Sequence, residues 1–184
     1  MNHNDHVMLL RDGIAAGDDS GEPTVWADFG SGGGAFTLAL ADLLGDDATI
    51  HSVDRDRGAL NAQERAMRAR FPATTVQYHQ ADFTRPLGLP ALDGLVIANA
   101  LHFVRESEKL PVVRRLRAYL RPGGRLILVE YGTDRGNHWV PYPLSYPTWS
   151  ALAAAAGFAT TRLLATVPSR FLGSIYSASA VSEQ

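Results

Sequence analysis

The stretch "VWADFGSGGGAFTLALADLL", residues 25–44, decides the fold. A short apolar run typical of a buried strand leads through an acid into a glycine-rich segment, and apolar residues at helical spacing follow. Glycine accepts positive φ and lets a ligand lie against the backbone. A tight turn without a ligand is the alternative, but four glycines in five positions cost considerable chain entropy. The stretch therefore predicts a strand, a ligand-binding turn and a helix.

The composition limits the class of protein. The 184 residues are 46% hydrophobic, which suits a single domain over residues 1–184, with residues 1–22 as an N-terminal extension and possible lid. The chain has no cysteine, which excludes disulfides, thiolate nucleophiles and thiolate-bound metals. A formal net charge of -2 gives no global basic field, so a nucleic-acid partner is not expected.

The N-terminus does not resemble a targeting segment. It carries acids and histidines, and no later run is apolar for the roughly 18 residues that a membrane span needs. We expect a soluble, cytoplasmic protein without a membrane partner; the oligomeric state stays open. His3 and His6 have no carboxylate at ligand spacing, so they are interpreted as mobile terminal residues and no metal site is predicted.

Hydrophobic periodicity predicts alternating strands and helices. Strands are expected at 24–28, 49–54, 74–79, 92–99 and 124–131, and helices at 35–44, 57–71 and 107–120. In the last of these helices, Ser107 as the N-cap would place Pro111 in the first turn, and Gly123 and Gly124 would close the helix. Crossover helices between strands give a parallel sheet.

The C-terminal third follows a different pattern. A helix is expected at about 148–156, followed by strands at 158–167 and 170–180 that only Pro168 and Ser169 separate. So short a gap holds no crossover helix, so these strands should be antiparallel neighbours. The predicted fold is α/β and doubly wound, with a Rossmann-like, mostly parallel seven-stranded sheet whose last strand is antiparallel.

Two kinds of cofactor fit the glycine turn. Gly30, Gly32 and Ala35 satisfy a dinucleotide fingerprint, with Asp54 about twenty residues on to hold a ribose. A sulfonium nucleoside fits as well, because its amino-acid end carries an ammonium group and it has no phosphate. Asp28 would attract the ammonium group and repel a pyrophosphate.

Five further segments, with this turn, resemble the class I S-adenosylmethionine-dependent methyltransferases. The family's first motif is an acid followed by alternating glycines, here DFGSGGG (28–34). The other segments are VDRD (53–56), ADF (81–83), ANALHFV (98–104), LRPGGRLILVE (120–130) and AAGF (155–158). The resemblance covers roughly residues 24–180, and its order and spacing are more specific than any one motif. It also implies the antiparallel last strand.

The resemblance implies a set of residues that bind S-adenosylmethionine. In this family's pattern Asp54 would bind both ribose hydroxyls, Asp82 would accept from the exocyclic amine of adenine, and the Phe83 amide would bond the ring. Asp28, Asp54 and Asp82 are expected on one rim of the sheet. The full set is Asp28, Gly30, Ser31, Gly32, Gly34, Asp54, Arg55, Asp82, Phe83, Asn99 and Ala100.

The acceptor side is less determined by sequence. His102 is the candidate general base if the acceptor is a hydroxyl, with a loop histidine that lines the pocket as the alternative. Tyr131, a second candidate catalytic residue, and Glu130 end the fifth strand and would orient an acceptor or fix the next loop. The aromatic residues of 133–149 would wall off an apolar pocket or pack the last helix; we expect a mixture, with Trp149 in the core.

The sequence thus predicts a methyltransferase that acts on a small molecule by in-line displacement. The first alternative is a methyltransferase of RNA or protein; the arginines at 114, 115, 117, 121 and 125 would then form a binding stripe instead of a solvated face. An NAD-dependent oxidoreductase or a non-catalytic cofactor-binding module is the remaining alternative.

Overall fold

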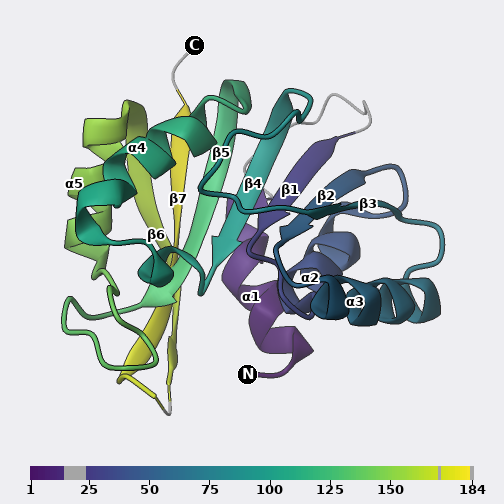
Figure 1. Cartoon of the computed structure of the whole chain (residues 1–184), viewed down its shortest axis with the longest axis horizontal. Coiled ribbons are helices and arrows are strands. Elements are labelled where there is room, and N and C mark those ends of the chain that lie inside the picture. Colours follow the sequence, from purple (N-terminus) through teal and green to yellow (C-terminus); the bar gives the residue numbers. More distant parts are fainter. Residues whose placement is uncertain (15–23, 170, 183–184) are drawn as a thin grey trace.

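The computed structural model describes residues 1–14, 24–169 and 171–182, and its centre is one seven-stranded sheet with helices on both faces (Figure 1). The strands are β1 (Val25–Phe29), β2 (Thr49–Asp54), β3 (Thr75–Gln80), β4 (Leu92–Ala98), β5 (Leu120–Tyr131), β6 (Phe158–Pro168) and β7 (Ser174–Ser182). The helices are α1 (His3–Ile14), α2 (Ala35–Leu44), α3 (Arg57–Arg70), α4 (Glu106–Arg117) and α5 (Tyr146–Ala156), with a 3-10 turn η1 (Leu101–Phe103). Within the described residues, none of the helices is both long and apolar enough to span a membrane.

The strand order is β3-β2-β1-β4-β5-β7-β6. Strands β1 to β5 pair in parallel, and β7 lies antiparallel between β5 and β6. This confirms the predicted mixed sheet and the antiparallel C-terminal pair. Since the order reverses between β1 and β4, a crevice is expected beyond their carboxyl ends.

Alternate residues of the central strands enter two separate cores. In β4, Leu95 and Ile97 join the core that α4 and α5 cover, whereas Val96 and Ala98 join the core under α1 and α2. A strand buried on both faces is expected to be a nearly continuous apolar run, as β4 is. The strand ends that carry the polar residues are therefore fixed by packing on both sides.

Helix α1 differs from the expectation for the N-terminus. His3 Nε2 lies 2.9 Å from Asp42 Oδ2, and the His6 ring lies 4.8 Å from the Phe36 ring. The α1 residues Leu9 and Leu10 are fully buried. The interpretation of both histidines as mobile is therefore wrong, because an apolar helix face packs them onto α2. Residues 15–22 of the predicted extension lie outside the described residues.

Helix α4 begins earlier than predicted. Its N-cap is Arg105, not Ser107, so Pro111 lies in the second turn. The Ser107 carbonyl loses its helical partner there, which exposure to water tolerates. The helix ends at Arg117 with Ala118 as its C-cap, and Gly123 and Gly124 instead lie inside β5, where its register with β4 shifts. The prediction that they close the helix is wrong.

Candidate active site

A pocket of about 700 Å³ opens where the carboxyl ends of β1, β2 and β4 meet. Its volume falls within the roughly 300–1,000 Å³ usual for small-molecule and cofactor sites. Of the predicted cofactor residues, those that line it are Gly30, Gly32, Asp54, Arg55, Asp82, Phe83, Asn99 and Ala100. The structure thus brings together residues that span seventy positions of the chain.

The glycine turn needs glycine for two different reasons. Gly30, Gly32 and Gly34 have φ of 71°, 51° and 86°, a region that other residues rarely adopt. A Cβ at Gly30 would also lie 2.6 Å from the Ala100 Cβ, whereas one at Gly32 would meet nothing within 4 Å. The turn therefore packs tightly at Gly30 and leaves bare backbone facing the pocket at Gly32.

Asp54 ends β2 and fixes the glycine turn. Its Oδ2 accepts a hydrogen bond from the Gly32 amide at 2.8 Å, and its Oδ1 accepts one from the Asp56 amide at 2.8 Å. Each carboxylate oxygen can accept a further hydrogen bond. Asp54 is therefore held in the pocket in one orientation and keeps the capacity to bind two hydroxyls.

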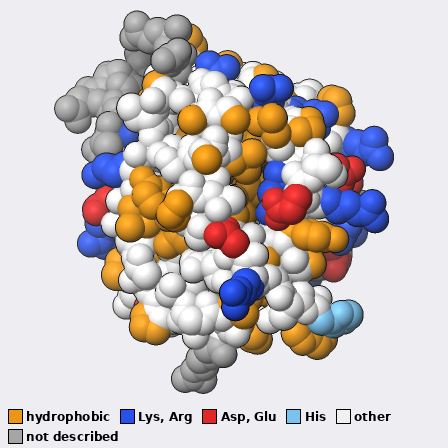
Figure 2. Space-filling model, turned by 90° about the vertical axis from the view of Figure 1, so that its left-hand side faces the viewer, with side chains coloured by type: hydrophobic (Ala, Val, Ile, Leu, Met, Phe, Trp, Pro, Cys, Tyr) orange, Lys and Arg blue, Asp and Glu red, His pale blue; other side chains and the backbone are white. Residues whose placement is uncertain are grey.

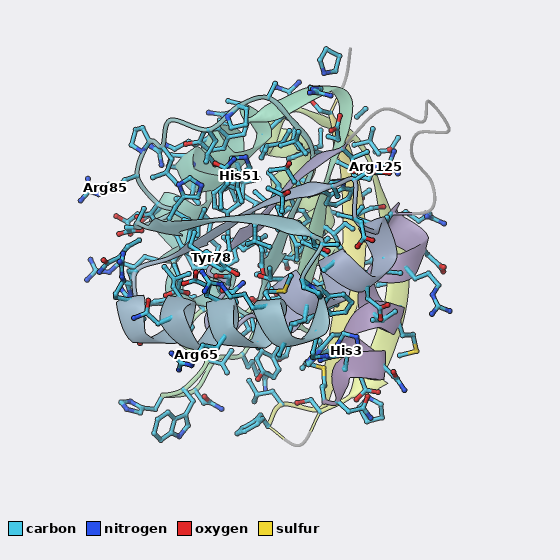
Figure 3. All side chains as sticks on the ribbon, turned by 90° about the vertical axis from the view of Figure 1, so that its right-hand side faces the viewer. His3, His51, Arg65, Tyr78, Arg85 and Arg125 are labelled. Atoms are coloured by element: carbon cyan, nitrogen blue, oxygen red, sulfur yellow. The ribbon has the colours of Figure 1, made fainter. Side chains whose placement is uncertain are left out.

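Asp82 is held in a similar way after β3. Its Oδ1 accepts from both the amide and the hydroxyl of Thr84, at 2.8 and 2.7 Å. Partial burial opposes ionisation, but the Thr84 hydrogen bonds and the charges of Arg55 and Arg85 lower the pKa of Asp82 below its usual value. Arg85 itself lies at the outer edge of the molecule in Figure 3. Asp82 is therefore an ionised acceptor that lines the pocket after β3.

Asp28 departs from the predicted rim. It lies within β1, is 1% exposed, does not line the pocket and accepts a hydrogen bond from Thr37 Oγ1 at 2.7 Å. Burial raises the pKa of Asp28 to about 7, and the Thr37 hydrogen bond offsets only part of that shift. The expectation that the three acids share one rim is therefore wrong for Asp28, because its side chain points under helix α2.

Ser31 and Gly34 also lie away from this pocket. Ser31 lines a second hollow of about 380 Å³ beside α1, together with His3 and His6. Gly34 is the N-cap of α2, where the side chain of Gln63 leaves no room for a Cβ. Both residues contact the protein on the side of the turn that faces away from the pocket.

The chain leaves β4 through a bend that joins the pocket to His102. Asn99 is the only residue other than glycine with positive φ, 50°, among the described residues, and its amide donates to the Val129 carbonyl at 2.9 Å. Asn99 and Ala100 thereby face the pocket, and η1 follows at once with His102 buried in it. His102 itself does not line the pocket.

His102 and Glu130 form a buried pair. His102 Nδ1 lies 2.9 and 3.1 Å from the two carboxylate oxygens of Glu130, and the His102 amide donates to Oε2 at 3.2 Å. Glu130, 0% exposed, also accepts from the Tyr131 amide at 2.8 Å. Because a carboxylate only accepts, Nδ1 carries the proton and Nε2 is left as the basic nitrogen.

Tyr131 packs beside this pair. Its ring centroid lies 5.7 Å from that of His102, and its side chain is mostly buried. Burial and the negative charge of Glu130 raise the pKa of Tyr131 above its usual value. A phenol that stays protonated at neutral pH is a donor or a wall, not a base.

The aromatic segment 132–145 is attached to both η1 and α4. The Tyr142 amide donates to the His102 carbonyl at 3.0 Å, and the Tyr142 carbonyl accepts from Lys109 Nζ at 2.5 Å. Lys109 is 2% exposed. The expected core position of Trp149 is confirmed, since it is fully buried, whereas Trp139 is 74% exposed.

Sequence reasoning missed the wall that α4 gives to the pocket. Pro111 and Val112 of α4 add apolar surface to that of Phe103 and Val104 in the preceding segment, and Arg115 of α4 binds the Thr84 carbonyl at 2.5 Å. A helix that follows β4 borders the same edge of the sheet, so the amphipathic spacing after position 102 was the available signal.

Four of the five arginines at 114–125, in α4 and β5, donate hydrogen bonds within the protein. Arg114 donates to the Ala155 carbonyl, Arg121 to Asp93 and Arg125 to the Gly13 carbonyl. On the face that α5 covers, Lys and Arg side chains are scattered and interspersed with acidic ones (Figure 2). This arrangement gives no support to an RNA-binding stripe.

A family model described as "Methyltransferase domain" matches residues 27–126, more than half of the chain. The chain belongs to this family. Methyltransferases of this family are enzymes that take a methyl group from S-adenosylmethionine, so the resemblance to the class I enzymes is confirmed.

Two curated relatives match part of this methyltransferase domain. Acetylserotonin O-methyltransferase of Mus musculus is 34% identical over 115 residues, which cover 58% of this chain and 28% of that protein. Carboxy-S-adenosyl-L-methionine synthase of Pseudomonas syringae pv. syringae is 32% identical over 127 residues, 64% of this chain and 49% of that protein. The chain thus spans half or less of the length of these curated relatives.

Solved structures show the same fold. The 1,6-didemethyltoxoflavin-N1-methyltransferase of Burkholderia thailandensis, with bound 1,6-didemethyltoxoflavin and S-adenosylhomocysteine, matches with a TM-score of 0.75 at 18% identity. The match covers 99% of this chain and 78% of that one. At this identity the likeness concerns the fold alone.

Proposed function

We propose that the protein transfers a methyl group from S-adenosylmethionine to a hydroxyl group of a small, largely apolar molecule. The observation that carries this proposal is the buried His102–Glu130 pair, which follows directly after Asn99 and Ala100 of the cofactor pocket. A histidine oriented by a carboxylate is a general base suited to a hydroxyl.

The pocket residues fit the methyl donor. The donor has an adenine amine, two ribose hydroxyls, an ammonium group and a sulfonium, and it has no phosphate. Asp54 and Asp82 both line the pocket and offer carboxylate oxygens from neighbouring strand ends, and the bare backbone at Gly32 leaves room for a ligand beside them. We assign the ribose to Asp54, the adenine amine to Asp82 and the ring to the Phe83 amide, with Arg55, Asn99 and Ala100 as walls.

When bound, S-adenosylmethionine supplies a methyl group on a positively charged sulfur, which keeps the electron pair of the broken carbon–sulfur bond. His102 Nε2 accepts the proton that the acceptor hydroxyl loses, and Glu130 stabilises the resulting imidazolium through Nδ1. A positioned base contributes about 10²–10⁴-fold to the rate. Orientation of the two reactants by the pocket contributes up to about 7–11 kcal/mol.

The surroundings of His102 support a small acceptor. Phe103, with its ring 4.3 Å from that of His102, is 60% exposed, and Tyr142 is 37% exposed. These aromatic faces suit an apolar or aromatic compound, and the arginines that a nucleic acid would need bind the protein itself. We further propose that the reaction takes place in the cytoplasm.

Calorimetric titration tests the proposed cofactor. We expect S-adenosylmethionine and S-adenosylhomocysteine to bind and NADH not to bind. Asp54→Ala should weaken binding more than about tenfold because it removes charge-assisted hydrogen bonds. Asp47→Ala, at an exposed acid outside the pocket, should change nothing. Binding of NADH alone would exclude the proposal.

A transfer assay tests the proposed acceptor class. Labelled S-adenosylmethionine is incubated with small phenols and alcohols, and separately with RNA and protein fractions. Label in the small-molecule fraction that depends on His102 supports the proposal. Label in RNA, with salt-sensitive binding, would overturn it in favour of the macromolecular alternative.

A further inference from the structure

A fully buried polar side chain, Gln63 of α3, lies beside the glycine turn. It is 0% exposed and shares its helix face with Leu60 and Met67, which are also buried. An apolar residue is expected at the position between them. A buried amide costs free energy unless its hydrogen bonds are satisfied, so its presence under the turn calls for a physical reason.

The Gln63 amide joins α3 to the turn through two serines. Gln63 Oε1 lies 3.0 Å from Ser52 Oγ and 3.4 Å from Ser31 Oγ, and the two serine oxygens lie 2.8 Å apart. Ser52 is in β2 and Ser31 is in the turn itself. All three side chains are buried, which strengthens these hydrogen bonds.

The same side chain supports the other end of the turn. The aliphatic part of Gln63 lies against Gly34, where a Cβ would overlap with it. Gln63 Nε2 has no hydrogen-bond partner among the described residues. The turn therefore contacts Gln63 at Ser31 and at Gly34, while Gly32 between them faces the open pocket.

We propose that Gln63 is a positioning residue for the cofactor: with Ser31 and Ser52 it sets the position of the Gly30–Gly34 turn against the amino-acid end of the methyl donor. This inference rests on the proposed assignment of adenosine to Asp54 and Asp82, which leaves the amino-acid end at the turn. Gln63 acts through the turn and touches no ligand atom.

Two ligands separate this role from a general structural one. S-adenosylhomocysteine has the amino-acid end and 5′-methylthioadenosine lacks it, but both carry the adenosine. Gln63→Met keeps the side-chain volume and removes the amide. We expect this variant to bind S-adenosylhomocysteine about tenfold more weakly than the unmodified protein does. Its affinity for methylthioadenosine should fall less than about twofold, as measured by calorimetry.

The serines supply a second, gentler test. Ser52→Ala should reproduce the selective loss at a smaller size and should add little in the Gln63→Met background, because both changes break one network. Ser177→Ala is the matched control: it removes a buried hydroxyl of β7 that has no hydrogen-bond partner in the described part of the chain, and it should leave both affinities unchanged.

The outcomes distinguish this inference from the proposed function. An equal loss of affinity for both ligands would overturn the positioning role. So would additive effects of Gln63→Met and Ser52→Ala on the affinity for S-adenosylhomocysteine. If Gln63→Met does not fold, the affinities of Ser52→Ala for the two ligands decide in the same way. Failure of the unmodified protein to bind S-adenosylhomocysteine would instead refute the proposed function.

Discussion

The proposed cofactor side of the site is made mostly of backbone, whereas the proposed acceptor side is made of side chains from the second half of the chain. On the cofactor side, glycines with positive φ and a carboxylate bound to backbone amides form the pocket. On the acceptor side, His102, Glu130 and Tyr142 come from three separate elements that side-chain and backbone hydrogen bonds join.

This difference explains how freely the residues on each side can be substituted. A turn that depends on φ and on close approach tolerates few residues, so its sequence is recognisable and its ligand is shared. A wall of aromatic side chains on a loop can change residue by residue without altering the sheet. We therefore expect the cofactor side to identify the family and the proposed acceptor side to decide which molecule is methylated.

The largest expected effect separates chemistry from cofactor binding. With an acceptor found in the transfer screen, His102→Gln should lower kcat by about 10²–10⁴-fold, because it removes the proton acceptor. Affinity for S-adenosylhomocysteine should stay within about threefold, since His102 does not line the pocket. Full activity in the variant would return His102 to the role of a structural loop histidine.

The second effect concerns the buried acid of the cofactor side. An unfolded Asp28 loses its proton near pH 4, whereas the folded one keeps it up to about pH 7. Between these values the folded state binds more protons, so stability falls as pH rises, by up to about 4 kcal/mol.

Asp28→Asn removes this titration and can still accept from Thr37. In urea unfolding, the stability of the variant relative to the unmodified protein should therefore increase from pH 5 to pH 8. Asp46→Asn, at an exposed acid, serves as the control. A constant difference between the two pH values would mean that Asp28 is ionised when buried.

The glycine turn offers a matched pair of substitutions. Gly30→Ala places a Cβ 2.6 Å from the Cβ of Ala100, at a position whose φ is positive. The variant should bind S-adenosylhomocysteine about a hundredfold more weakly. A Cβ at Gly33 would meet no atom within 4 Å, and Gly33 has no positive φ. The Gly33→Ala variant should therefore bind S-adenosylhomocysteine nearly as tightly as the unmodified protein does. Similar affinities of the two variants would show that the turn is not packed as described.

The smallest effect belongs to the acceptor wall. Tyr142→Ala should raise the KM for the acceptor about fivefold, because an aromatic contact is lost, and should leave the affinity for S-adenosylhomocysteine unchanged. Leu163→Ala, at an exposed residue of β6, is the control. An unchanged KM would place the acceptor elsewhere on the molecule.

Local sequence patterns predicted the helices and strands whose bounds depend on neighbouring residues in the sequence. The bounds of β2 and α2 agree with the predicted ones, because hydrophobic periodicity and Gly45 define them within a few residues. Helix α1 was missed, because its helical stabilisation comes from packing against α2 and the sheet. The start of α4 was misplaced because Ser107 resembles an N-cap while the backbone begins the helix two residues earlier.

The sequence predicted the site residues whose place follows from the backbone after a strand end. It did not predict the direction of Asp28 or the role of Gln63, because both depend on burial. Gly30, Gly32, Asp54 and Asp82 were predicted from position after strand ends, and all line the pocket. Asp28 follows the same motif but points inward, because direction within a strand decides which face a side chain takes. Gln63 gave no signal, since a glutamine in a charged helix reads as a solvated residue.

The structure of the protein crystallised with S-adenosylhomocysteine tests the central claim most directly. The account predicts adenine beside Asp82 and Phe83, the ribose hydroxyls on Asp54, and the amino-acid end over the Gly30–Gly34 turn. A ligand bound outside this pocket, or an adenosine with its ends reversed, would contradict it.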